Sequence, residues 1–113
     1  MFFHKNKDLE EFKKNFAYFS SQAPNAEFVI NSPTFLTSFL HTTDHNEGLA
    51  KLKKIQEDKK LNRKDEYLIA DMVRLVENLI EINSKDIELS EEEYKDKKKD
   101  IISFYTEVDC LVG

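Results

Sequence analysis

The amino-acid sequence predicts an all-α fold, a small helical bundle of four to five helices with an irregular segment around residues 20–32. The chain has only two glycines and two prolines, and no proline follows Pro33. Most β architectures need such turn residues at short intervals, so they are excluded. Apolar residues recur at spacings of three and four, which is the period of one helix face. A length of 113 residues suits one core, and residues 1–113 are expected to form a single helical domain.

The first helix is predicted from about Lys7 to Phe19, because Leu9, Phe12, Phe16 and Phe19 are spaced by 3, 4 and 3 positions. This spacing places their side chains on one face of a helix. Acidic residues in the first turn complement the helix macrodipole.

The next segment is less regular. Pro24 breaks any helix there, and the run from Phe28 to Ile30 is expected to be extended. Ser32 then predicts the start of a second helix as its N-cap, with Pro33 at the first helical position.

Two further helices follow from capping patterns. Asp44 with Glu47 three residues later indicates the start of a third helix, and Asn62 is expected to cap a fourth that runs to about Asn83. The fourth helix has an unusually wide apolar stripe, which is typical of a helix contacted by more than one neighbour. We therefore expect it at the centre of the bundle. Its stripe comprises Leu68, Ile69, Met72, Val73, Leu75, Val76, Leu79, Ile80 and Ile82.

The last helix has the clearest start, because Ser90 followed by three glutamates forms an S-x-x-E capping box. Its inner face is predicted from the apolar periodicity of the residues that follow. The inner-face residues are Tyr94, Ile101, Tyr105, Val108 and Val112, with Phe104 and Leu111 beside them.

The stretch from Leu75 to Ile102 resembles the SHOCT-type short helical hairpin of bacterial proteins. That module joins a leucine-bearing helix through a turn to a helix that opens with Ser or Thr, three glutamates and an aromatic residue. The resemblance implies an interaction or oligomerisation module with no catalytic residues. Asp86 stands where the family usually has a turn glycine. The matching residues are Leu79, Ile82, Ile87, Leu89, Ser90, Glu91, Glu92, Glu93, Tyr94, Lys98, Ile101 and Ile102.

Phenylalanine is concentrated in the front part of the chain. Core filling is the expected role of these rings, with a partly exposed docking surface as the alternative. Phe2 and Phe3 precede any helix that could bury them regularly, so they are the candidate interaction residues. The phenylalanines before residue 40 are Phe2, Phe3, Phe12, Phe16, Phe19, Phe28, Phe35 and Phe39.

The net charge of −5, from 22 acidic and 17 basic residues, argues against nucleic-acid binding, whose affinity comes from neutralising phosphates. No apolar run approaches the length of a membrane span. The single cysteine, Cys110, excludes an internal disulfide and fits a cytoplasmic location. A buried apolar role is expected for Cys110, and an exposed, redox-active thiol is the alternative.

The segment from His41 to Glu47 is the only cluster with metal-ligand chemistry. His41 and His45 would share a face if the segment were helical. The zinc-protease pattern fails, because Thr42 stands where its glutamate is needed. A polar loop whose Asp44 caps the next helix is the expected structure. No metal and no cofactor is therefore predicted, and His41, His45 and Glu47 remain the candidate ligands of the alternative.

No catalytic signature is found, so we expect a non-enzymatic protein that binds another protein. A bacterial or phage-borne regulator, inhibitor, immunity protein or adaptor fits the size, the acidity and the missing chemistry. One alternative is a structural protein that self-assembles through its helical rear half, for example as a homodimer. The other is a metal-binding bundle that uses His41 and His45.

Overall fold

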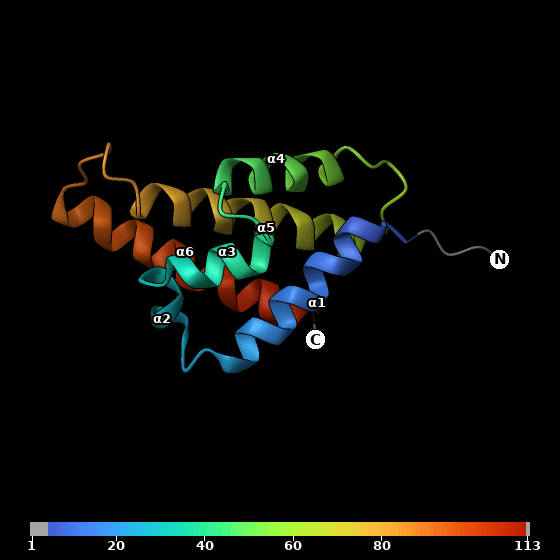
Figure 1. Cartoon of the computed structure of the whole chain (residues 1–113), viewed down its shortest axis with the longest axis horizontal. Coiled ribbons are helices and arrows are strands. Elements are labelled where there is room, and N and C mark those ends of the chain that lie inside the picture. Colours follow the sequence, from blue (N-terminus) through green and yellow to red (C-terminus); the bar gives the residue numbers. More distant parts are fainter. Residues whose placement is uncertain (1–4, 113) are drawn as a thin grey trace.

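The computed structural model describes residues 5–112, and these form six α-helices and no strand (Figure 1). The all-α class predicted from the sequence is confirmed, although the helices number six and not four to five. The additional helix lies in the segment expected to be irregular. The helices are α1 (Lys7–Gln22), α2 (Ala26–Ile30), α3 (Pro33–Leu40), α4 (His45–Gln56), α5 (Arg63–Ile82) and α6 (Glu91–Val112).

The short helix α2 corrects the prediction of an extended stretch from Phe28 to Ile30. Asn25 acts as its N-cap, since the side-chain oxygen accepts a hydrogen bond from the backbone N–H of Phe28 at 2.9 Å. The single turn then buries Val29 and Ile30 in the core. The capping amide and two buried β-branched side chains thus outweigh the weak helix propensity of this sequence.

The predicted helix starts are confirmed by their caps. The side chains of Ser32, Asp44 and Asn62 each accept a hydrogen bond from the backbone N–H three residues later, at 3.3, 3.2 and 2.8 Å. At the start of α6 the capping box is reciprocal. Ser90 Oγ accepts from the N–H of Glu93 at 3.1 Å, and Glu93 Oε1 accepts from the N–H of Ser90 at 3.4 Å.

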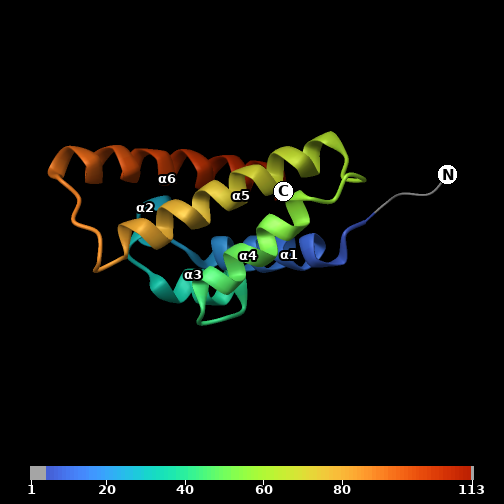
Figure 2. The same cartoon turned by 90° about the horizontal axis from the view of Figure 1, so that it is seen from above.

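Helix α5 lies between α4 and α6, as its wide apolar stripe predicted. Figures 1 and 2 show α5 and α6 as a long antiparallel hairpin, with α4 running along α5. The α5 residues buried in this packing are Leu68, Ile69, Met72, Val73, Leu75, Val76 and Leu79.

Among residues 5–112 no helix is both long and apolar enough to cross a bilayer.

An aromatic cluster joins α1, α3 and α6. The Phe16 ring packs edge-on against Phe39 at a centroid distance of 5.3 Å and against Phe35 at 5.9 Å. Tyr105 of α6 lies 5.4 Å from Phe16, and Phe12 lies 5.8 Å from Phe39. These five side chains are buried. The core role predicted for the front phenylalanines is confirmed for the four in this cluster.

Two expectations for α6 are wrong. Tyr94 was expected on the inner face but is 40% exposed, because α5 ends at Ile82 and leaves the first turn of α6 without a neighbour on that side (Figures 1 and 2). Cys110 was expected to be buried and is exposed. Two residues advance a helix by about 200°, so Cys110 points away from the side that Val108 buries.

Candidate functional site

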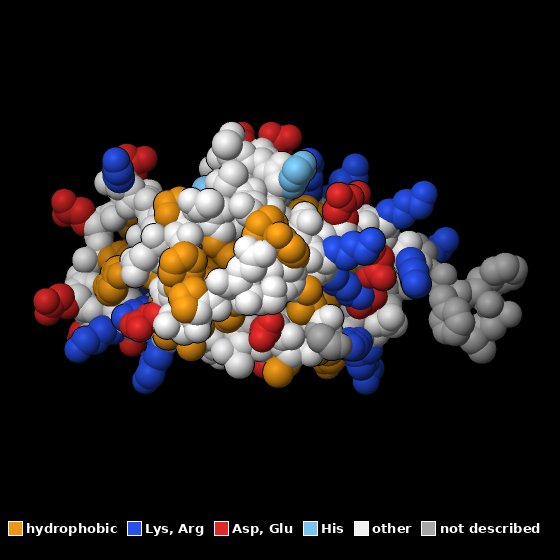
Figure 3. Space-filling view, turned by 60° about the horizontal axis from the view of Figure 1, so that its bottom comes forward, with side chains coloured by type: hydrophobic (Ala, Val, Ile, Leu, Met, Phe, Trp, Pro, Cys, Tyr) orange, Lys and Arg blue, Asp and Glu red, His pale blue; other side chains and the backbone are white. Residues whose placement is uncertain are grey.

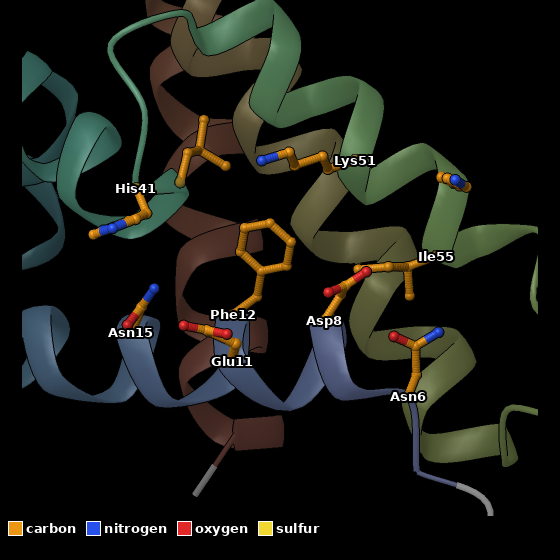
Figure 4. Close-up of a pocket in the computed structure, with 10 residues that line it drawn as sticks. Asn6, Asp8, Glu11, Phe12, Asn15, His41, Lys51 and Ile55 are labelled. Carbon is orange, nitrogen blue, oxygen red and sulfur yellow. The ribbon is translucent and has the colours of Figure 1, made fainter.

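An open cleft of about 490 Å³ lies between α1 and α4, and we call it the α1–α4 cleft (Figure 4). Its first wall is one face of α1, where Asp8, Glu11, Phe12 and Asn15 stand at positions i, i+3, i+4 and i+7. This helix face therefore presents two carboxylates beside an aromatic ring. Asn6, the N-cap of α1, lies at the end of the same wall.

The second wall comes from α4, where Lys51, Lys54 and Ile55 share a face at positions i, i+3 and i+4. The floor is apolar and almost closed to solvent: Phe12, Leu40 and Ile55 are 6%, 2% and 3% exposed. Figure 4 shows Phe12 extending from α1 toward α4, and Lys51 and Ile55 extending from α4 into the same recess.

Hydrogen bonds tie both ends of the α1 wall to the rest of the fold. Asn6 Nδ2 donates to Asp58 Oδ2 at 3.0 Å, which ties the start of α1 to the connection after α4. Asn15 Nδ2 donates to the backbone carbonyl of Phe39 at 3.4 Å, which ties α1 to α3. These contacts connect α1 to α3 and to the segment that follows α4.

The charges on the two walls do not neutralise one another. Asp8 and Glu11 on α1, and Lys51 and Lys54 on α4, are exposed. Within residues 5–112 none of these four side chains forms an ion pair or a hydrogen bond. One wall is therefore negative, the other is positive, and both keep their bonding capacity for a ligand.

Neighbouring charges on the same two helices behave differently. Lys13 of α1 binds Asp65 of α5 with a nitrogen–oxygen distance of 2.8 Å. Lys53 of α4 binds Glu77 of α5 at 3.5 Å. These pairs connect helices to one another, whereas the cleft charges face an opening.

The two histidines lie on different elements and do not share a helix face. His41 ends α3 in a left-handed conformation, with φ of 57°, and its side chain lines the cleft. His45 begins α4, and its Nε2 lies 2.9 Å from Thr37 Oγ1. Glu47 supplies the backbone N–H that Asp44 caps, as expected for the loop structure. Within residues 5–112 no group of three or more His, Cys, Asp or Glu side chains is placed to hold a metal ion.

The predicted interaction residues, Phe2 and Phe3, lie outside the described residues, so their role stays a prediction. Among the front phenylalanines that are described, Phe28 is the most exposed, at 49%. In Figure 3 hydrophobic side chains emerge as separate patches over the left and central parts of the face, and charged side chains lie toward both ends. The large hydrophobic residues exposed among residues 5–112 are Tyr18, Phe28, Tyr67, Ile87 and Tyr94.

Comparison with known proteins gave no match to a protein-family model, to a curated protein or to a solved structure. The resemblance of residues 75–102 to the SHOCT-type hairpin therefore stays a prediction.

The α1–α4 cleft was not predicted from the sequence. Its signal is present as two acids three positions apart on α1 and two lysines three positions apart on α4. Such spacing shows that each pair shares a helix face, but it does not show that the two faces lie opposite one another. Only the packing of α1 and α4, which are distant in sequence, reveals that relationship.

Proposed function

We propose that this protein is a non-enzymatic binding protein that acts on another protein through the α1–α4 cleft. The observation that carries the proposal is the pair of oppositely charged walls, whose four charged side chains form no ion pair or hydrogen bond within residues 5–112. Charges arranged in this way favour specific recognition and fast association with a complementary surface. A regulator, inhibitor or adaptor of another protein fits this arrangement.

Two further observations support a binding role over catalysis. Among residues 5–112 no charged side chain is buried, whereas a catalytic acid or base is typically desolvated. The cleft is also open and rimmed by exposed charges, and it offers no nucleophile next to a base. Its chemistry is that of ion pairing.

The test is affinity capture from the native cell, followed by binding measurements with the purified partner. The double variant Lys51→Glu/Lys54→Glu should weaken the complex by at least tenfold. The matched control, Lys95→Glu/Lys99→Glu, makes the same change of charge at two exposed lysines on α6 outside the cleft and should leave affinity within about twofold. A failure to capture any stoichiometric partner, or turnover of a substrate by the purified protein, would refute the proposal.

Self-association is a second candidate, favoured by apolar side chains at the other end of the molecule. Phe28 of α2, Tyr94 of α6 and Ile87 between α5 and α6 are all at least 40% exposed. An ion pair between Glu27 and Lys98 joins α2 to α6 in this region. Exposed apolar groups of this kind often mark interfaces. If this end of the bundle forms a dimer, Phe28→Ser/Tyr94→Ser will convert it to monomer in sedimentation equilibrium.

A further inference from the structure

We propose that the α1–α4 cleft binds a short extended peptide segment of the partner in which basic and acidic side chains alternate. The inference rests on the proposed function and names the chemistry of the partner. Three properties of the cleft lead to it: the signs of its walls, its volume and the spacing of its charges.

The signs of the walls require an occupant that carries both charges. Asp8 and Glu11 attract a cation, and Lys51 and Lys54 attract an anion. A segment that carries charge of a single sign would be attracted by one wall and repelled by the other. Like charges that face each other across an interface cost several kcal/mol of binding free energy. A segment with both signs satisfies both walls at once.

The volume favours an extended chain over a helix. About 490 Å³ lies within the range of clefts for small ligands. A helix with its side chains measures roughly 10–12 Å across, and would need a longer and wider groove. An extended segment is narrower and contributes few residues, so it fits the opening between α1 and α4.

The spacing of the charges favours alternation. Successive side chains of an extended chain point to opposite sides, and the chain advances about 3.3 Å per residue. Side chains at i and i+2 therefore face one wall and lie about 6.6 Å apart. The three-residue step from Asp8 to Glu11, like that from Lys51 to Lys54, spans about 4.5 Å of helix axis. Flexible Lys, Arg and Glu side chains can bridge that difference, so every second residue addresses the same wall.

The probes are four fluorescein-labelled octapeptides with blocked termini, measured by fluorescence anisotropy against the full chain. One repeats Lys-Glu, one has four lysines followed by four glutamates, one repeats Lys-Gln and one repeats Glu-Gln. The block peptide is the matched control, because its composition and net charge equal those of the alternating peptide. We expect the alternating peptide to bind at least tenfold more tightly than the other three, and raised salt to reduce that advantage.

Reversing one wall should switch the preference. With Asp8→Lys/Glu11→Lys both walls are positive, so the Glu-Gln peptide should become the best ligand. With Lys51→Glu/Lys54→Glu both walls are negative, so the Lys-Gln peptide should become the best ligand. Melting curves establish that each variant folds. A neutralised wall, Asp8→Asn/Glu11→Gln on α1 or Lys51→Gln/Lys54→Gln on α4, should remove the preference for the alternating peptide and replaces the reversal of the same wall if that variant does not fold.

Equal affinity for the alternating and block peptides, or the same ranking in wild type and wall variants, would overturn the inference. A native partner that binds wild type and both wall variants equally would also overturn it, while leaving a binding function through another surface intact. Tight binding of free lysine and glutamate in place of the peptide would identify a small-molecule site and count against a protein segment.

Discussion

Gly48 of α4 lies directly against Leu40 at the end of α3. A β-carbon placed on Gly48 would fall 2.8 Å from Leu40 Cδ1, 2.9 Å from Leu40 Cβ and 3.0 Å from Leu40 Cγ. Real β-carbons do not approach other atoms this closely, so only glycine permits the packing of α4 on α3. Leu40 is also part of the floor of the α1–α4 cleft. The close approach therefore links the position of the α4 wall to the identity of one residue.

The first prediction concerns this contact. Gly48→Ala should destabilise the fold by about 1–3 kcal/mol through overpacking, even though alanine is favoured over glycine within a helix by about 1 kcal/mol. The free energy of unfolding from urea melts measures the change. In a Leu40→Ala background the same substitution should cost less but remain destabilising, because Cγ and Cδ1 are gone while Cβ, at 2.9 Å, remains. A stabilising effect in the wild-type background would show that α4 can move away from α3.

The second prediction concerns the centre of the bundle. Leu79 of α5 is 1% exposed, so Leu79→Ala should lower the free energy of unfolding by about 2–4 kcal/mol. Tyr67 lies on the same helix but is 61% exposed, so Tyr67→Ala should change it by less than about 0.5 kcal/mol. Similar urea midpoints for the two variants would contradict the central position of α5.

The third prediction concerns the left-handed residue that ends α3. His41 has φ of 57°, a conformation that costs a residue with a β-carbon about 1–2 kcal/mol. His41→Gly should therefore stabilise the fold by about 0.5–1 kcal/mol, after allowance for the greater freedom of glycine in the unfolded chain. His41→Ala is the control, because it removes the imidazole but retains the strain, and should give no gain in thermal melting.

The fourth prediction concerns pH. The pKa of Asp71 is raised above its ordinary value of 3.8, first because partial burial desolvates the carboxylate and second because Glu107 lies near it; Arg74 partly opposes this. Between the ordinary and the raised pKa the folded state binds more protons than the unfolded state, so stability falls as pH rises through that window. Replacing the ionised carboxylate by a neutral group should therefore raise the free energy of unfolding at neutral pH.

We expect Asp71→Asn to raise the free energy of unfolding by a few tenths of a kcal/mol at pH 7, where Asp71 is charged, and by almost nothing near pH 3. The effect is small because solvent screens a partly exposed group. Asp96→Asn, at an exposed position on α6, serves as the control for removing a charge. An equal effect of Asp71→Asn at both pH values would contradict the raised pKa of Asp71.

Much of the fold could be predicted from the sequence, because helix starts depend on local chemistry. Four helices start at capping residues whose side chains bond to a backbone N–H only three positions away: Ser32, Asp44, Asn62 and Ser90. The helix after Asn25 was missed for the opposite reason. Its single turn depends on the burial of its apolar residues in the tertiary fold, and local propensity alone does not support it.

The exposure of individual side chains was harder to predict than the helices. Tyr94 follows the apolar period of α6, but that period does not reveal where the neighbouring helix ends. The exposure of Cys110 could have been read from the same period, since position 110 lies off the stripe through Ile101, Tyr105 and Val108. The cleft required the relative placement of α1 and α4, which no local pattern encodes.

The last prediction concerns Phe2 and Phe3, the interaction residues expected from the sequence. Aromatic anchors dominate interface energetics, so Phe2→Ser/Phe3→Ser should abolish partner capture or dimer formation and change the free energy of unfolding by less than about 0.5 kcal/mol. Tyr67→Ser is the control, because it removes an exposed ring of α5 that lies in neither proposed surface. Urea melts, sedimentation and capture are measured on the same preparations. A large loss of stability with binding retained in the folded fraction would contradict this prediction and indicate that both residues belong to the core.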